Sequence, residues 1–179
     1  SGAPTLSQLG RMVGASPAHL QRVFKGLLGV TPRQFADAGR MDRFKAKLRE
    51  GWDVTDAMYD AGYSSSSRLY EGAAGHLGMS PASYRRGGKG AQIAYTTVGC
   101  PLGQLMVAAT EKGVCAVKLG SSPEELEADL RDQFSQARLF PDDSHLGRWI
   151  RAILQHLEGK QPGLKSPLEL PLDVRATAF

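Results

Sequence analysis

Two cysteines are the side chains of this sequence best suited to covalent chemistry, because a thiolate is a strong nucleophile. Cys100 precedes Pro101 with no histidine or arginine close behind it, and Cys115 lies in an apolar run typical of a core strand. An ordinary cysteine is ionised to only about a few per cent at neutral pH unless a base, cation or metal lowers its pKa. His19 and His76 have no ligand partner at a useful spacing. We therefore expect no metal site, no disulfide framework and no acceptor cysteine.

A second set of side chains could form hydrogen bonds to DNA from one face of a helix. Ser16 is a good N-cap and Pro17 suits the first helical position. The apolar residues then recur at helical spacing, at Leu20, Val23, Phe24, Leu27 and Leu28. The opposite face carries Ala18, Gln21, Arg22 and Lys25. A shorter apolar pattern before this helix stops at Gly14, so the two segments predict a helix-turn-helix unit.

The charges are divided unevenly between the two halves of the chain. Residues 1–90 contain 13 Lys and Arg against 7 Asp and Glu, whereas residues 91–179 contain 9 against 11. A basic half beside a mildly acidic half favours a polyanion-binding domain joined to a second domain. No apolar run is long enough to span a membrane, so we expect a cytoplasmic protein.

The helix-turn-helix pattern occurs twice. Residues 29–35 are similar to residues 78–84, at an offset of 49, and Ser65 corresponds to Ser16 as an N-cap. Between the units, residues 32–50 read as one helix of about 28 Å, close to the ~34 Å between successive major-groove faces. Its apolar residues available for burial are Phe35, Met41, Phe44 and Leu48. The duplication predicts an all-α, double helix-turn-helix domain over residues 1–86.

This domain resembles the AraC/XylS-type transcription regulators in its motifs Ser16–Lys25, Gly29–Pro32, Ala61–Ser65 and Gly78–Arg85. The resemblance implies two recognition helices in adjacent major-groove segments on one face of double-stranded promoter DNA, with the chain bound as a monomer. For the first unit it implies DNA contacts by Ala18, His19, Gln21, Arg22 and Lys25. For the second unit it implies DNA contacts by Ser66, Ser67, Arg68, Tyr70 and Glu71.

The second unit departs from the family pattern. Ala73 stands where the family has a large aromatic residue, and Gly72 and Gly75 are poor helix formers. We therefore expect the second unit to be less stable and less sharply specific than the first. Glu71 could accept a hydrogen bond from a cytosine amino group, or it could only pair with Arg68 or with solvent.

The second half of the chain has a different periodicity. Glycines at 87, 88 and 90 predict a flexible linker over residues 87–92. Alternating apolar residues then predict a three-stranded meander, followed by a helix that Ser122 caps and by another helix from about Ser144 to Gly159. The expected fold class is therefore multi-domain, with the all-α domain followed by a small α+β domain over residues 93–175.

This α+β domain resembles the ribonuclease-H-like N-terminal domain of the DNA alkylguanine methyltransferases, in residues 94–98, 101–110 and 113–117. Residues 176–179 look like the start of the catalytic domain that follows it in that family. An AraC-type domain fused to this domain is the arrangement of the Ada-type regulators of the alkylation response. In that family the methyl acceptor is a cysteine in a Pro-Cys-His-Arg motif, and this motif does not occur in the sequence. Zinc is expected only in a four-cysteine N-terminal module.

The resemblance predicts a bacterial, nucleoid-associated transcription regulator of the alkylation response. It also implies that the regulator is part of an Ada-type DNA-repair methyltransferase and contacts RNA polymerase. We expect no methyltransferase activity and no cofactor in these 179 residues themselves. An alternative is an AraC-type regulator whose ribonuclease-H-like domain is a non-catalytic scaffold or a partner-binding domain. A third possibility is that the second domain shares only the fold and holds an unrelated ligand site.

Overall fold

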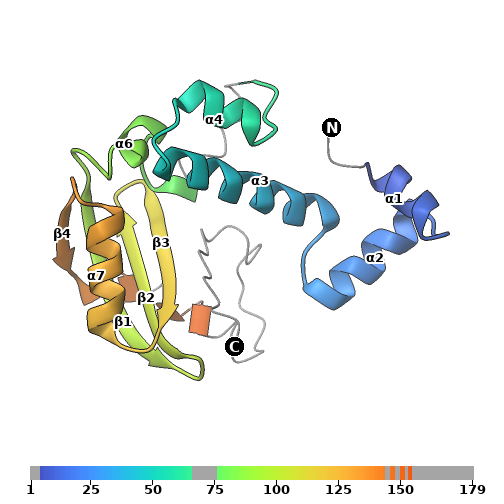
Figure 1. Cartoon of the computed structure of the whole chain (residues 1–179). Coiled ribbons are helices and arrows are strands. Elements are labelled where there is room, and N and C mark those ends of the chain that lie inside the picture. The colour runs from blue at the N-terminus through green and yellow to red at the C-terminus, as the bar shows by residue number, and fades with distance from the viewer. Residues whose placement is uncertain (1–4, 66–75, 144–145, 148–149, 152, 155–179) are drawn as a thin grey trace.

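The computed structural model describes residues 5–65, 76–143, 146, 147, 150, 151, 153 and 154 (Figure 1). The N-terminal helices are α1 (Leu6–Met12), α2 (Pro17–Leu28), α3 (Pro32–Arg49), α4 (Val54–Asp60) and α6 (Pro81–Arg85). The second half contains β1 (Gln92–Cys100), β2 (Gly103–Thr110), β3 (Gly113–Gly120), α7 (Pro123–Gln133) and β4 (Arg138–Pro141). A helical domain followed by a small mixed sheet domain is the fold class that the sequence predicts.

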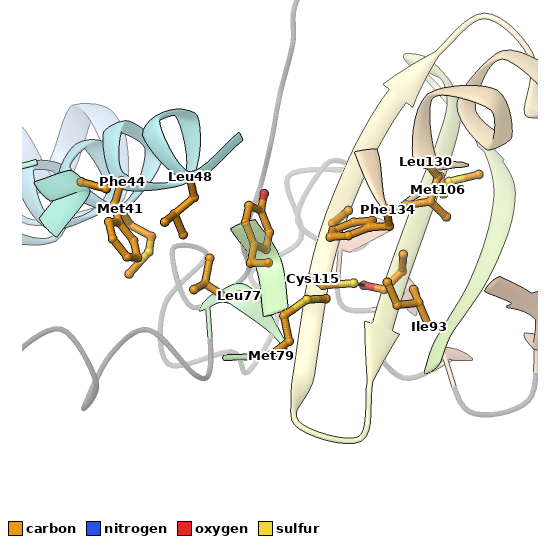
Figure 2. Close-up of a cluster of buried hydrophobic side chains, with 14 of the residues drawn as sticks. Met41, Phe44, Leu48, Leu77, Met79, Ile93, Met106, Cys115, Leu130 and Phe134 are labelled. Carbon is orange, nitrogen blue, oxygen red and sulfur yellow. Dashed lines mark hydrogen bonds between the residues drawn. The ribbon is translucent and has the colours of Figure 1, made fainter. Parts of the chain in front are cut away.

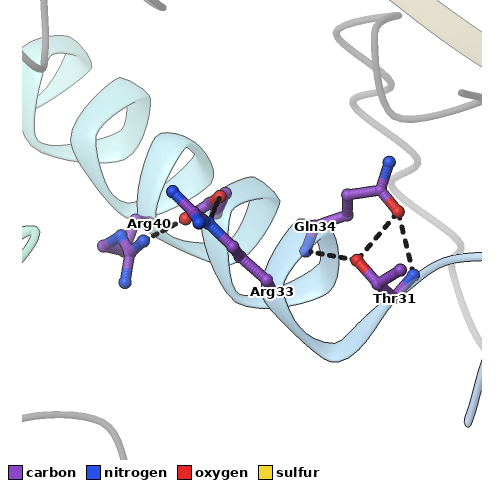
Figure 3. A network of polar contacts seen from close by, with 5 residues as sticks. Thr31, Arg33, Gln34 and Arg40 are labelled. Atoms are coloured by element: carbon purple, nitrogen blue, oxygen red, sulfur yellow. Dashed lines mark hydrogen bonds and ion pairs between the residues drawn. The ribbon is translucent and has the colours of Figure 1, made fainter. Parts of the chain in front are cut away.

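Local capping sets the start of each of these six helices. A Ser, Thr or Asp side chain accepts a hydrogen bond from a backbone amide of the first turn at every one of them. Figure 3 shows the cap of α3, where Thr31 Oγ1 accepts from the Gln34 amide at 3.2 Å and Gln34 Oε1 accepts from the Thr31 amide at 2.9 Å. One turn later, Arg33 and Arg40 both pair with Asp37. These surface pairs add little to stability, so the capping box is the main local signal.

The sheet has the strand order β3-β2-β1-β4. Strands β1, β2 and β3 form the predicted antiparallel meander, whereas β4 pairs in parallel with β1. Strand β4 is not predictable from the sequence, because its four residues are too few to show a period. Between Ala108 and Ala109 the pairing of β2 with β3 shifts, and Cys115 is the extra residue of this β-bulge.

The two faces of the sheet bury different side chains, as the alternation along a strand requires. On one face, Leu105 and Val107 pack against Leu146, Ile150 and Ile153 of the segment after β4. The other face carries Ile93, Met106, Ala108, Cys115 and Ala116, which lie against α7 and against the helical half.

One hydrophobic core joins the helical half to the sheet. Figure 2 shows Leu77 and Met79 between Phe44 of α3 on one side and Cys115 and Phe134 of the sheet domain on the other. All five side chains are buried. The second half of the helical domain therefore shares its apolar interior with the sheet domain.

The segment that we expected to be a flexible linker is instead a series of tight turns packed on the sheet domain. The carbonyl of Gly87 accepts from the Gln136 amide at 2.9 Å, and the Ala91 carbonyl accepts from the Arg138 amide at 2.9 Å. A Cβ atom on Gly88 would lie 2.9 Å from the Cβ of Ala137. Here the glycines allow positive φ angles and let the backbone approach the sheet domain closely, and they do not form a flexible linker.

The first helix-turn-helix unit is packed far less than the second. No side chain of α2 is buried, and Leu27 on its predicted apolar stripe is 78% exposed. Phe35, which we expected to be buried, is 57% exposed. Its ring packs edge to face on the ring of Phe24, with the ring centroids 5.7 Å apart. In the second unit, Ala57 and Leu77 are fully buried. The described residues of the second unit are therefore better packed than those of the first, whereas Gly72, Ala73 and Gly75, on which the expectation of lower stability rests, lie outside the described residues.

Candidate DNA-binding surface

The turn between α1 and α2 holds the two helices of the first unit close together. A Cβ atom on Gly10 would lie 2.5 Å from the carbonyl oxygen of Ala15, so only glycine fits at this crossing. The Ala15 amide in turn donates to the Gly10 carbonyl at 2.9 Å, and Gly14 takes the left-handed conformation with φ 66°. Ser16 then caps α2 by accepting from the His19 amide at 3.2 Å. These contacts fix the direction in which α2 begins.

The five side chains of α2 predicted to contact DNA are all exposed, namely Ala18, His19, Gln21, Arg22 and Lys25. Neither Arg22 nor Lys25 has an ion-pair partner among the residues that the structure describes. Their charged groups are therefore available to an external anion. The structure places these residues as the sequence predicts, and their role in DNA binding stays a prediction.

The whole first unit has a positive electrostatic field. Residues 1–36 contain four Arg and Lys residues and no Asp or Glu. Arg11 at the end of α1 and Arg33 at the start of α3 flank α2 on both sides, and both are exposed. Neither arginine is among the DNA contacts that the family resemblance implies, although the long stretch without acidic residues points to both. A surface of this charge attracts the phosphate backbone of DNA.

Helix α3 separates the two units. Its 18 residues correspond to a length of about 27 Å, close to the length expected from the sequence. On its inner side, Phe44 packs edge to face on Tyr63 with ring centroids 6.2 Å apart, and the Arg40 guanidinium lies 6.0 Å from the centre of that ring. Desolvation raises the pKa of Tyr63. These contacts connect α3 to the turn of the second unit.

The second unit begins with α4, and the expected turn follows that helix. Gly62 takes a left-handed φ of 89°, and Asp53 caps α4 by accepting from the Thr55 amide at 2.8 Å. This backbone hydrogen bond lowers the pKa of Asp53, whose carboxylate also pairs with Arg85 at 3.1 Å. The predicted DNA contacts of this unit, Ser66, Ser67, Arg68, Tyr70 and Glu71, lie outside the described residues.

The two cysteines occupy different environments. Cys115 is 2% exposed, and its thiol donates to the Ala108 carbonyl at 3.4 Å. Burial raises the pKa of Cys115 to about 12, so it is a neutral core residue, as the sequence predicts. Cys100 is half-buried at the end of β1, opposite Gly103 in the hairpin. Among the described residues, no group of three His, Cys, Asp or Glu side chains could hold a metal ion. The described residues therefore do not fit the zinc associated with Ada-type proteins.

A polar cavity of about 400 Å³ lies where the two halves meet. Two lysines, Lys89 and Lys112, and one acid, Glu111, contribute to its wall, together with Ser80 and Ser83 of the α6 region. These three charged side chains give the wall a net charge of +1. Within the described ranges, no helix is both long and apolar enough to cross a membrane.

Comparisons with known proteins agree with both halves of this architecture. Residues 9–87 match the helix-turn-helix domain family, and residues 93–174 match the 6-O-methylguanine DNA methyltransferase, ribonuclease-like domain. The melibiose operon regulatory protein of Escherichia coli K12 is 28% identical over 85 residues, which are 47% of this chain and 28% of that protein. The helical half is thus also similar to a regulator outside the methyltransferases.

Two relatives match nearly the whole chain. The bifunctional transcriptional activator/DNA repair enzyme Ada of Escherichia coli K12 is 36% identical over 175 residues, covering 98% of this chain and 48% of that protein. The regulatory protein ada of Salmonella typhimurium LT2 is 35% identical over the same length, with the same shares. The chain spans about half the length of either relative. Both domains match in this order and the alignment covers nearly every residue, so the chain is similar along almost its whole length to about half of an Ada-type protein, in which a helix-turn-helix domain precedes a methyltransferase ribonuclease-like domain.

Proposed function

We propose that this chain is the DNA-binding, regulatory part of an Ada-type protein and acts as a sequence-specific transcription regulator of the alkylation response. The observation that carries the proposal is the surface of α2, an exposed helix that presents Gln21, Arg22 and Lys25 and stands between Arg11 and Arg33 in the chain. The relatives that match over 98% of the chain are named as a transcriptional activator and as a regulatory protein, which supports the same function.

The chemistry of α2 suits the edges of base pairs in the major groove. Arginine donates two hydrogen bonds to guanine, glutamine pairs with adenine, and a small methyl group contacts the methyl of thymine. Arg22, Gln21 and Ala18 supply these three groups from one helical face. Lys25 lies one turn further on, where a phosphate contact contributes affinity without sequence preference.

The length of α3 supports binding of both units by a single chain. About 27 Å of helix lies between them, and one helical turn of DNA is about 34 Å long. We propose that one chain contacts two adjacent major-groove segments on one face of promoter DNA, as a monomer. We also propose that the bound chain contacts RNA polymerase and acts in the cytoplasm.

For the repair reaction, we propose that neither cysteine of this chain accepts a methyl group. A methyl acceptor must be a thiolate within reach of the alkylated base or phosphate. Cys115 is buried with a pKa of about 12, and the hairpin end at Cys100 places no described base or cation against its thiol. The sheet domain is then a structural part of the methyltransferase, whose acceptor cysteine and zinc module belong to other parts of an Ada-type protein.

Selection of bound duplexes from a random library tests the regulatory function. The purified chain is expected to enrich duplexes with two preferred blocks about 10 base pairs apart, centre to centre. The enriched duplex should then bind more tightly than a scrambled duplex of the same length at the same salt concentration. Enrichment of no motif, or equal affinity for both duplexes, would contradict sequence-specific binding.

A further inference from the structure

The turn between β2 and β3 contacts the residues that directly follow the predicted second recognition helix. We propose that this turn positions the second helix-turn-helix unit for specific DNA binding, through a contact between Thr110 and Gly78. The sheet domain would then take part in DNA recognition without touching DNA. The inference rests on the DNA-binding function proposed above.

The Thr110 hydroxyl accepts one hydrogen bond and donates one, and its surroundings fix which is which. Its Oγ1 accepts from the Lys112 amide at 3.0 Å. The single hydroxyl proton is therefore available to donate, and it is donated to the carbonyl oxygen of Gly78. Because the turn of β2 and β3 orients the hydroxyl, the position of the Gly78 carbonyl is coupled to the sheet.

Gly78 is also held by close packing. A Cβ atom there would lie 2.6 Å from the carbonyl oxygen of Gly113 and 2.9 Å from the Cβ of Cys115. Cys115 reaches this position because it is the extra residue of the β-bulge in β3, which lies on the face toward the helical half. Both the hydrogen bond and the packing therefore hold the same peptide.

The neighbours of Gly78 transmit this restraint along the chain. Leu77 is fully buried and Met79 is 3% exposed, and both belong to the core shared with the sheet. A shift of Gly78 would displace both side chains from close-packed surroundings. The sheet domain thus holds three consecutive residues of the second unit, namely Leu77, Gly78 and Met79.

Among the residues that the structure describes, the first unit has no equivalent contact. Gly29 stands at the position that corresponds to Gly78 and has a similar left-handed φ, 74° against 63°. A Cβ atom on Gly29 would meet nothing within 4 Å, whereas one on Gly78 would overlap the β2–β3 turn. The local conformation is the same in both units, and only the second is held by the sheet domain.

The test uses the full chain, a duplex selected from a random library by the unmodified protein, and a scrambled duplex. Thr110→Val removes the hydroxyl and keeps the shape of the side chain. It is expected to weaken binding to the selected duplex about fivefold, the effect of one lost hydrogen bond, and to relax base preference only in the block that the second unit reads. Binding to the scrambled duplex and the salt dependence of binding should not change.

Two controls separate positioning from a general loss of stability. Thr110→Ser keeps the hydroxyl and should bind like the unmodified chain. Thr97→Val makes the same substitution in β1, where Thr97 pairs with Met106, four residues along β2 from Thr110, and it should also have no effect. Hydrogen exchange gives an independent measurement, because Thr110→Val should speed exchange of the amides of residues 76–79.

If Thr110→Val binds the selected duplex as tightly as the unmodified chain does, or weakens both blocks equally, the positioning role is refuted. If the unmodified chain itself does not distinguish the selected duplex from the scrambled one, the proposed DNA-binding function fails instead.

Discussion

Replacement of Leu77 by alanine is expected to destabilise the helical half and the sheet domain together. Leu77 has no exposed surface and lies in the core to which α3 and the sheet both contribute. A buried Leu→Ala substitution costs about 2–5 kcal/mol, because the lost apolar transfer free energy adds to that of the cavity. A loss of about 3 kcal/mol lowers the Tm of a domain of this size by about 6–12 °C.

The measurement is a thermal unfolding curve combined with hydrogen exchange of the amides in β2 and β3. Leu27→Ala is the matched control, since the same atoms are removed from a side chain that is 78% exposed. This control should change the free energy of unfolding by less than about 0.5 kcal/mol. The reasoning is refuted if Leu77→Ala leaves exchange in β2 and β3 unchanged, or if both substitutions cost the same.

Four further predictions concern binding, local stability and thiol chemistry. Arg22→Ala should cost about 1–3 kcal/mol of specific binding free energy and relax the preference at one base position. Lys25→Ala should weaken binding to specific and scrambled duplexes alike and reduce the slope of log affinity against log salt concentration by about 1. Binding titrations at two salt concentrations distinguish the two variants, and identical behaviour would contradict the assignment of the recognition helix. Amides of α2 should exchange faster than those of α4 without DNA and become protected on binding, and equal protection without DNA would count against the unequal packing of the two units. Duplex with a radiolabelled methyl group on O6-methylguanine or on a phosphotriester should leave no label on Cys100 or Cys115, so stoichiometric transfer to either would overturn the structural role of the sheet domain. Because the folded pKa of Cys115 is raised to about 12 from 9.0, the free energy of unfolding should fall as the pH rises between these values, and a urea titration series should show a smaller fall for Cys115→Ala.

Helix starts were predictable because their signals are local. Ser16, Thr31 and Ser122 each cap a helix within three residues of their own position, so no distant contact is needed to find them. The three-stranded meander was predictable from alternation and turn residues for the same reason. Strand β4 was not, because its short segment becomes a strand only by pairing with β1.

Glycine composition was misleading at the domain junction. Gly87 and Gly88 have the composition of a flexible linker, yet the same residue type is required where two backbones approach closely. The sequence cannot distinguish these two uses, since the difference lies in what surrounds the glycine. Here Ser135 and Ala137 stand within about 3 Å of the added Cβ positions, and the turn is therefore part of the interface.

The sequence by itself determined the two helix-turn-helix units and the exposed face of α2, because caps, turns and helical period depend on neighbouring residues. Only the tertiary structure decided which unit is packed. Gly29 and Gly78 occupy equivalent positions and have similar backbone angles, but no described atom lies within 4 Å of a Cβ on the first, whereas the β2–β3 turn touches the second. Burial depends on which distant segments come together, and neither glycine's own sequence neighbourhood contains that information.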